Sequence, residues 1–343
     1  MSTWNEMVGD QSDVVISSRV RLARNISGYP FTHAASQEAL KEVVKYVKAS
    51  IDEIKTPLGL KWVDLQKMTQ IDRSHYVEKH LMSIELAESK TAAALILNQD
   101  ESLSIMVNEE DHLRIQGILP GLQLETTYKL CNDFEERMGE KVNYAFYEQL
   151  GYLTSCPTNI GTGLRVSAMM HLPALAESGW LKKILEACGK MGVAVRGVYG
   201  EKSGAEGNIF QISNQVTIGH SEEDIIENML HIINQIIEKE RSVRQRILNS
   251  NRLAFEDKIF RAYGILANAR SITAAETMEH MSWIRLGIAL EVIDFINPVN
   301  MNILLVDVQP GSIQKNAGRE LSAEERDEQR ASLCRKMMER ETI

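Results

Sequence analysis

A long isoleucine-rich stripe is the feature that most constrains the fold of this chain of 343 residues. Ser221 and Asp224 form a capping-box start for it. The apolar residues that follow recur at helical spacing, and they are Ile225, Ile226, Met229, Ile232, Ile233, Ile236 and Ile237. The chain beyond Ile218 is therefore predicted to be mostly helical.

Two further helices are predicted in this part of the chain. Thr273 is an N-cap for a helix that runs to about Phe295, where Pro298 closes it. Ser322 opens a capping box for a last helix through Arg340. No repeat or low-complexity tract is evident, and we place a domain boundary near 250–258.

The chain before residue 218 has a different pattern. An amphipathic helix is predicted over residues 36–55, and two antiparallel strands, 92–97 and 103–107, are joined by a turn. Further strands are expected at 142–146, 164–170, 193–195, 208–213 and 215–218, and helices at 126–138 and 174–188. Strands paired locally with helices between them indicate an α+β fold.

The charge balance limits the partners of the chain. Lys and Arg number 38 against 47 Asp and Glu, so the formal charge is −9. No general attraction for nucleic acid or an anionic membrane follows, and a bound anion needs a local cluster of cations. The N-terminus has no signal-peptide core and no apolar run reaches a membrane span, so a soluble protein is expected. Four cysteines without a CxxC pair disfavour a metal site or disulfides and favour a reducing, cytoplasmic location.

Common nucleotide-binding motifs are missing from the sequence. The Gly189-Lys190 pair lacks the upstream glycine of a Walker A loop, and neither HRD nor DFG occurs. A GxG at Gly161 continues without the third glycine of a dinucleotide fingerprint. We discard the P-loop, protein-kinase and Rossmann interpretations.

Arginines in short, unusual contexts remain as candidates for anion binding. They are Arg19, Arg21 and Arg24 in VVISSRVRLARN, Arg114 in NEEDHLR, Arg165 in CPTNIGTGLR and Arg196 in VRGVYGE. Arginine offers a planar, permanently charged fork for phosphate oxygens, and two residues two apart on a strand share one face. On spacing alone, such arginines more often form a solvated strand face than an anion-binding site. Taken by themselves, the carboxylates Glu109, Glu110 and Asp111 indicate a solvated turn. Cys156, taken by itself, indicates a packing residue.

Together these segments resemble the catalytic domain of the phosphagen kinases, the arginine and creatine kinase family. The matching stretches are VVISSRVRLARN, VNEEDHLRIQ, CPTNIGTGLRVS and VRGVYGEKSGAEGNIFQISN, over residues 13–220. Within that superfamily the chain is most similar to the bacterial protein-arginine kinases, the McsB family. It lacks most of the N-terminal domain that closes over small guanidino substrates, and it adds a helical C-terminal region of about 90 residues containing RDEQRA, an RDxxRA motif.

The resemblance implies an α+β fold: a phosphagen-kinase-like catalytic domain, residues 1–253, with a central antiparallel sheet flanked by helices. An all-helical C-terminal domain, residues 254–343, would follow. The implied nucleotide-binding residues are Ser17, Ser18, Arg19, Val20, Arg21, His80, Arg114, Arg165, Val166, Ser167, Ala168, Met169, Arg196, Gly197, Val198, Tyr199 and Gly200. Tyr199 stands where small-substrate kinases carry an arginine, and Lys202 stands where they carry a histidine.

The implied catalytic residues are Glu110, Glu201 and Cys156. The chemistry explains these residue types, because a guanidinium has a pKa of about 12.5 or higher and cannot attack phosphorus until a proton leaves. Glu110 and Glu201 would clamp the planar group, and Glu110 would accept the proton. Arginines with Mg²⁺ would neutralise the transferring phosphoryl group, and Cys156 would tune the guanidinium electrostatically.

The RDxxRA motif implies a second site. Arg326 and Arg330 are four apart on one helix face, with Asp327 between them and Ala331 after them. On spacing alone, an exposed ion-pair ladder is the commoner interpretation. The resemblance favours an allosteric pocket for phosphoarginine, on a neighbouring subunit or on the chain itself.

The resemblance therefore predicts an ATP- and Mg²⁺-dependent protein-arginine kinase. It implies a role in stress response and protein quality control, with the CtsR repressor and misfolded proteins as substrates. The implied partners are the activator McsA and the ClpC-ClpP protease, and a homodimer is expected, with no direct nucleic-acid or membrane partner. Two alternatives remain open: a phosphagen kinase acting on free arginine, and a non-catalytic phosphoarginine-binding adaptor.

Overall fold

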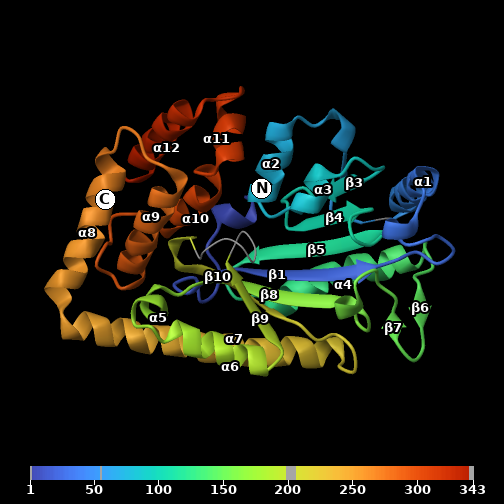
Figure 1. The fold of residues 1–343 in the computed structure, drawn as a ribbon, viewed down its shortest axis with the longest axis horizontal. Coiled ribbons are helices and arrows are strands. Elements are labelled where there is room, and N and C mark those ends of the chain that lie inside the picture. Colours follow the sequence, from blue (N-terminus) through green and yellow to red (C-terminus); the bar gives the residue numbers. More distant parts are fainter. Residues whose placement is uncertain (1, 55, 198–205, 340–343) are drawn as a thin grey trace.

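An eight-stranded sheet forms the centre of the computed structural model, which describes residues 2–54, 56–197 and 206–339 (Figure 1). The strand order is β2-β3-β4-β5-β1-β8-β10-β9, and all neighbours are antiparallel. The strands are β1 (Val15–Arg24), β2 (Lys61–Val63), β3 (Ala94–Leu97), β4 (Leu103–Val107), β5 (Leu113–Pro120), β8 (Leu164–His171), β9 (Val193–Gly197) and β10 (Ile209–Asn214). The predicted central antiparallel sheet is confirmed, including the β3–β4 hairpin.

The two faces of the sheet differ in chemistry because side chains alternate along each strand. In β1, Val20 and Leu22 are fully buried on one face, whereas Arg19 and Arg21 point to the other. We call these the core face and the arginine face. The same alternation continues in β8, where Val166 is buried in the core and Arg165 is only partly buried.

Three long helices cover the core face: α1 (Gln37–Glu53), α4 (Leu124–Gly139) and α7 (Glu222–Ser250). The predicted capping box of α7 is present, and all seven residues of its apolar stripe are buried. The predicted helices at 36–55 and 126–138 are confirmed as α1 and α4. These helices and the core face share one hydrophobic cluster.

The C-terminal part of the chain is helical, as predicted, and stands at one end of the sheet (Figure 1). Its helices are α8 (Arg252–Asn268), α9 (Ala274–Ala289), α10 (Pro298–Asp307), α11 (Pro310–Ala317) and α12 (Ala323–Met337). A second hydrophobic cluster joins them to the sheet through Met106, Ile118 and Met169. Two helices near the arginine face, α2 (Gln70–Glu78) and α3 (Ile84–Glu88), belong to the same cluster. In the described part of the chain, no helix combines the length and apolarity needed to span a bilayer.

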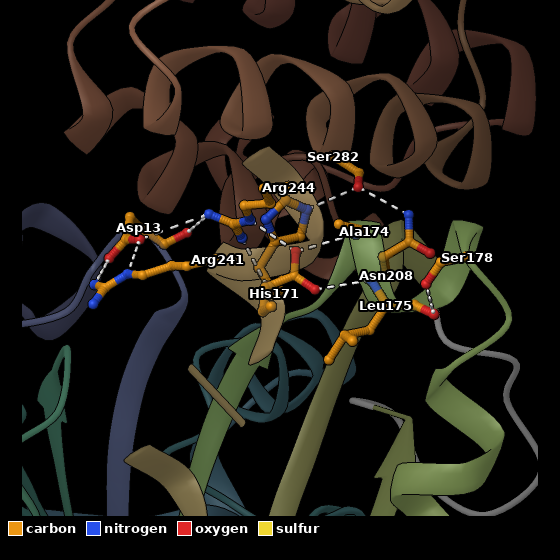
Figure 2. Close-up of polar contacts among 10 residues, drawn as sticks. Asp13, His171, Ala174, Leu175, Ser178, Asn208, Arg241, Arg244 and Ser282 are labelled. Carbon is orange, nitrogen blue, oxygen red and sulfur yellow. Dashed lines mark hydrogen bonds and ion pairs between the residues drawn. The ribbon is translucent and has the colours of Figure 1, made fainter. Parts of the chain in front are cut away.

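A buried polar network fastens the two parts together (Figure 2). Arg244 of α7 is paired with Glu240 at 2.7 Å and donates to the carbonyl of His171 at 3.1 Å. Glu240 in turn accepts the backbone N–H groups at the start of α5 (Pro173–Glu177). The His171 ring is hydrogen-bonded to Ser282 of α9 at 2.8 Å. The end of strand β8 is thus fixed by both α7 and a C-terminal helix.

Several predicted elements are wrong in detail. Residues 142–146 form a bridge at Tyr144 and become a strand at Phe146, within the separate hairpin of β6 (Phe146–Tyr147) and β7 (Gly151–Tyr152). Residues 215–218 form a loop, because the Asn214 side chain takes the next positions of the ladder: its Oδ1 accepts the Val166 N–H at 2.8 Å and its Nδ2 donates to the Leu164 carbonyl at 3.0 Å. The helix predicted over 174–188 is two helices, α5 and α6 (Leu181–Lys190), separated by Gly179 in the left-handed region. Pro298 begins α10, a position that its missing N–H suits, and α9 ends earlier than predicted.

Candidate active site

Strand register collects the predicted arginines on the arginine face. Arg21 lies opposite Arg165 of β8 on one side and Gln116 of β5 on the other. Arg196 of β9 lies opposite Gln211 of β10. A cavity of about 1030 Å³ opens on this face, and it is lined by Arg19, Arg21, Arg114, Arg165 and Arg196 among others. Five arginines that lie far apart in sequence therefore meet in one cavity.

The arginines of this cavity are buried close to one another, so their positive charges repel. Burial, together with the nearby charges of Arg114 and Arg165, lowers the pKa of Arg19 to about 10. Burial also lowers the pKa of Arg21 well below its usual value, again with neighbouring arginines contributing. The pKa of Arg165 is lowered by burial and by Arg196. Like charges gathered out of water favour binding of a polyanion, which would neutralise them.

Polar side chains from β10 orient two of these arginines. Gln211 Oε1 accepts a hydrogen bond from Arg19 Nη2 at 2.6 Å, and Ser213 Oγ accepts one from Arg165 Nη2 at 3.3 Å. The sequence analysis missed both residues. They lie within the family-like stretch NIFQISN at alternate positions, so the strand prediction could have placed them on one face.

A pair of carboxylates forms one wall of the cavity. Glu109 and Glu110 follow β4, and Arg114 bridges them, with Nη1 2.8 Å from Glu109 Oε1 and Nη2 3.2 Å from Glu110 Oε2. Glu109 is nearly fully buried and also accepts a hydrogen bond from Ser83 at 2.9 Å. The Glu110 side chain is 41% exposed and faces the cavity. Glu109 thus holds Arg114, whereas Glu110 is the carboxylate open to a ligand.

The environment of Glu110 suits a proton acceptor. Burial raises the pKa of this carboxyl above its usual value, and the charges of Asp111, Glu109 and Glu85 raise it further, against the opposing effect of Arg114. A raised pKa makes the carboxylate a stronger base than an ordinary glutamate.

The loop that carries Cys156 lines the cavity beside Glu110. The Cys156 sulfur lies 3.1 Å from the Thr158 hydroxyl. Asp111 ties this loop to the Glu110 turn, because Oδ1 accepts the backbone N–H of Ser155 at 2.6 Å. The sulfur and the Glu110 carboxylate therefore belong to one connected rim.

His80 also lines the cavity, at a strained turn after α2. Its φ of 60° is uncommon for a residue other than glycine. Gln116 Nε2 donates to the His80 carbonyl at 2.7 Å, and the Trp4 indole donates to the Lys79 carbonyl at 3.0 Å. Burial lowers the pKa of His80 to about 3, so its ring is neutral. Fixed strain of this kind is frequent at functional sites.

Some predicted nucleotide-binding residues do not line the cavity with their side chains. They are Ser17, Ser18, Val20, Val166, Ser167, Ala168, Met169 and Gly197. Ser18, for example, donates to the Gly121 carbonyl at 2.8 Å. Val198, Tyr199, Gly200 and Glu201 lie outside the described residues. Their assignments stay predictions.

The predicted phosphoarginine-binding residues lie on α12: Arg326, Asp327, Arg330 and Ala331. Arg330 is almost fully buried, and it donates to the carbonyls of Val308 at 2.7 Å and Ile272 at 2.9 Å. It also forms an ion pair with Asp327. Arg326 donates to a backbone carbonyl at 2.9 Å. In this arrangement Arg330 stabilises the helical region.

Two family models match this sequence. The family model described as "ATP:guanido phosphotransferase, C-terminal catalytic domain" matches residues 42–243, and "Protein-arginine kinase McsB C-terminal domain" matches residues 252–342. A protein-arginine kinase of Brevibacillus brevis is 44% identical over 98% of this chain and 95% of its own length. A protein-arginine kinase of Halalkalibacterium halodurans is 46% identical over 98% and 94%.

Solved structures show the same fold. Lombricine kinase matches with a TM-score of 0.62 and 23% identity, over 69% of this chain and 68% of that one. The duplicated taurocyamine kinase of Schistosoma mansoni, with bound transition state analog components, matches with a TM-score of 0.61 and 27% identity, over 68% and 34%. The near full-length likeness to the bacterial enzymes, together with both family models, shows that this chain belongs to the protein-arginine kinase family.

Proposed function

We propose that this chain transfers the γ-phosphoryl group of ATP to arginine side chains of other proteins. One observation carries the proposal: a single cavity brings five arginines together with the carboxylate of Glu110 and the thiol of Cys156. The arginines match the charge of a triphosphate, and the carboxylate matches the charge of a guanidinium. Phosphoryl transfer from one to the other needs both parts side by side.

The arginine face would hold the nucleotide. Arg19, Arg21, Arg114, Arg165 and Arg196 would neutralise the charge that spreads over the transferring phosphoryl group and the departing ADP. His80 and the strand residues named with them in the sequence analysis would contact the rest of the nucleotide. Mg²⁺ would enter as its complex with ATP and share the phosphate charge. Among the described residues, no three His, Cys, Asp or Glu side chains are grouped to hold a metal ion.

Glu110 would bind and activate the substrate arginine. Its carboxylate accepts a proton from the guanidinium as the nitrogen–phosphorus bond forms and the bond from phosphorus to the ADP oxygen breaks. Glu201 would hold the other edge of the guanidinium. Cys156 would tune the same group electrostatically, with the Thr158 hydroxyl 3.1 Å away to orient the sulfur. No covalent enzyme intermediate is required.

The cellular setting remains part of the proposal. Membership of the family supports a cytoplasmic enzyme of stress response and protein quality control that acts on a CtsR-type repressor and on misfolded proteins. McsA would be its activator and ClpC-ClpP the protease that receives its products, and the active form would be a homodimer.

We also propose domains 1–253 and 254–343. Allosteric binding of phosphoarginine at Arg326 and Asp327 would require Arg330 to exchange the Asp327 partner that it has here.

Mass spectrometry of an unfolded basic protein, incubated with the enzyme and Mg·ATP, tests the function. Samples stay at neutral pH because the phosphorus–nitrogen bond is acid-labile. We expect phosphate on arginine residues with wild type and its loss with Glu110→Gln. Phosphorylation of free arginine with none on protein would instead identify a phosphagen kinase. No ATP consumption with either substrate would favour the adaptor.

A further inference from the structure

His80 occupies a position that helices usually give to glycine. It follows Lys79, the C-cap of α2, and its N–H donates to the Val77 carbonyl at 2.9 Å. The next N–H, that of Leu81, donates to the Tyr76 carbonyl at 3.0 Å. This pair of hydrogen bonds is the Schellman motif, whose left-handed residue is most often glycine because glycine has no Cβ atom. A histidine with a φ of 60° is strained there, which points to a use for its side chain.

Two side chains from distant segments hold the end of α2 in this conformation. Gln116 of β5 donates to the His80 carbonyl at 2.7 Å, and the Trp4 indole donates to the Lys79 carbonyl at 3.0 Å. The last carbonyls of a helix have no acceptor role within the helix, so side chains from elsewhere can bind them. The strained turn is therefore imposed by tertiary contacts and not by the sequence of α2 alone.

Gln116 connects this turn to the arginine face. It is 3% exposed, its Nε2 also donates to Ser104 Oγ at 3.0 Å, and it lies opposite Arg21 in the register of β5 and β1. Gln116 and His80 line the same cavity as the arginines. The strand that carries Gln116 thus fixes His80 relative to the residues that would hold the phosphates.

Trp4 supports the same turn from the N-terminal segment, which lies beside α2 (Figure 1). Its side chain is almost fully buried, and its ring centroid lies 6.0 Å from that of His80. The segment is itself anchored to the C-terminal helices, because the Met7 carbonyl accepts a hydrogen bond from Asn302 Nδ2 of α10 at 2.9 Å. Trp4 therefore restricts both the backbone before His80 and the space around its ring.

We propose that Gln116 and Trp4 are positioning residues for the nucleotide site, and that they act by holding the His80 turn so that its ring stays in the cavity. The inference rests on the proposed function, which assigns His80 to the nucleotide. A strained conformation persists only while the surrounding contacts impose it. Loss of either donor would let the turn relax, and the ring would leave the position in which it meets the nucleotide.

The first test is Gln116→Met, which keeps the length of the side chain and removes the donor. Calorimetry with Mg·ADP should show a Kd about fivefold higher, the effect of one neutral hydrogen bond, while the KM for an arginine peptide at saturating Mg·ATP stays unchanged. The matched control is Gln123→Met, which removes a donor to the Pro120 carbonyl at 2.6 Å, outside the cavity. This control should leave the Kd for Mg·ADP unchanged.

A double-mutant cycle with His80→Gly separates positioning from a general structural role. Glycine suits the left-handed turn and removes the ring, so His80→Gly should itself weaken binding of Mg·ADP at least as much as Gln116→Met. Adding Gln116→Met to His80→Gly should then have no further effect on the Kd. Trp4→Phe keeps an aromatic ring and removes the indole donor, and it should follow the same pattern. It also provides a second variant if Gln116→Met does not fold.

An unchanged Kd for Mg·ADP in both Gln116→Met and Trp4→Phe would overturn the positioning role. A rise of equal size with and without the His80 ring would overturn it too, because the effect would not pass through His80. The proposed function fails differently: wild type would not bind Mg·ADP, or His80→Gly would leave the Kd unchanged and refute the assignment of His80 to the nucleotide.

Discussion

Two sets of buried arginines in this protein have opposite surroundings. Arg244 on α7 and Arg24 at the end of β1 each meet a buried carboxylate at 2.7 Å, Glu240 and Glu135 respectively. Arg19 and Arg21 instead share their cavity with other arginines, and burial lowers the pKa of both. Removing one partner of a buried ion pair destabilises the fold, because it leaves the other charge buried without its partner, whereas a buried charge beside like charges is held ready for a ligand.

The largest expected effect is on stability, at Arg244. Arg244→Met leaves Glu240 fully buried with an unbalanced charge, which costs roughly 3–5 kcal/mol in the free energy of unfolding. Urea denaturation followed by circular dichroism measures it. The matched control is Arg252→Met, which removes an equally short but exposed pair with Glu256 and should cost about 0.5 kcal/mol. Equal losses for the two variants would contradict the comparison.

The next effect is on activity, at Arg21. Arg21→Met removes a charge that the cavity holds against repulsion, so the free energy of unfolding should not fall. The kcat/KM should drop by about 10²–10³-fold, since a phosphate-stabilising donor is lost from the transition state. Steady-state kinetics measure the fall in kcat/KM, and urea denaturation of the same preparation measures the free energy of unfolding. Arg24→Met, on the same strand, should show the reverse balance, and a large stability loss in Arg21→Met would place it with the structural arginines.

The third expected effect concerns Arg114, which pairs with carboxylates and also lines the cavity with the other arginines. It lies 3.2 Å from Glu110 and also lines the cavity, so phosphates that attract it would release Glu110 for the substrate. Calorimetry with an arginine peptide should show about tenfold tighter binding when a non-transferable ATP analogue is present with Mg²⁺. Arg114→Gln should remove most of this coupling. Arg165→Gln removes the same charge from a side chain that interacts with Glu110 only at longer range, whereas Arg114 forms the direct ion pair, so this variant should keep most of the coupling. Equal loss in both would mean simple charge neutralisation.

The smallest effect is on the pH profile. Because burial and, to a smaller extent, neighbouring carboxylates raise the pKa of Glu110, its basic form is lost on acidification at a pH above that of an ordinary glutamate. The acid limb of kcat/KM against pH should therefore lie above pH 4.5, the usual value for this side chain. Glu85→Gln removes one of the raising charges and should move the limb to lower pH by a few tenths of a unit. Glu88→Gln, on the same helix, should leave it in place, and a shift to higher pH for Glu85→Gln would contradict the assignment.

Local patterns made much of this architecture predictable. The stripe of α7 and the capping boxes at Ser221 and Ser322 depend on neighbours within one or two turns, and they were predicted correctly. The cavity arginines came from motif resemblance. Periodicity could not predict that Arg21 and Arg165 are cross-strand neighbours, because strand register is set by contacts between distant segments.

The same reasoning explains what was missed. Gln211 is uncharged, and the strand pattern could place it on one face of the sheet but not beside Arg19, so only the observed hydrogen bond to Arg19 shows that it belongs to the site. Spacing alone favoured an exposed face for Arg330, and the resemblance favoured a phosphoarginine pocket. The side chain is buried and donates to carbonyls just after α10 and in the loop before α9, contacts that no helical pattern within α12 reveals. Tertiary contacts, rather than local sequence, decide such roles.

The most direct test of the central claim is a crystal structure of the enzyme with Mg²⁺, a non-transferable ATP analogue and an arginine peptide. The account predicts phosphate oxygens within hydrogen-bond distance of Arg19, Arg21 and Arg165, and the peptide guanidinium bound to Glu110 with its nitrogen facing the γ-phosphorus. A nucleotide bound away from the arginine face, or a guanidinium that does not contact Glu110, would contradict it.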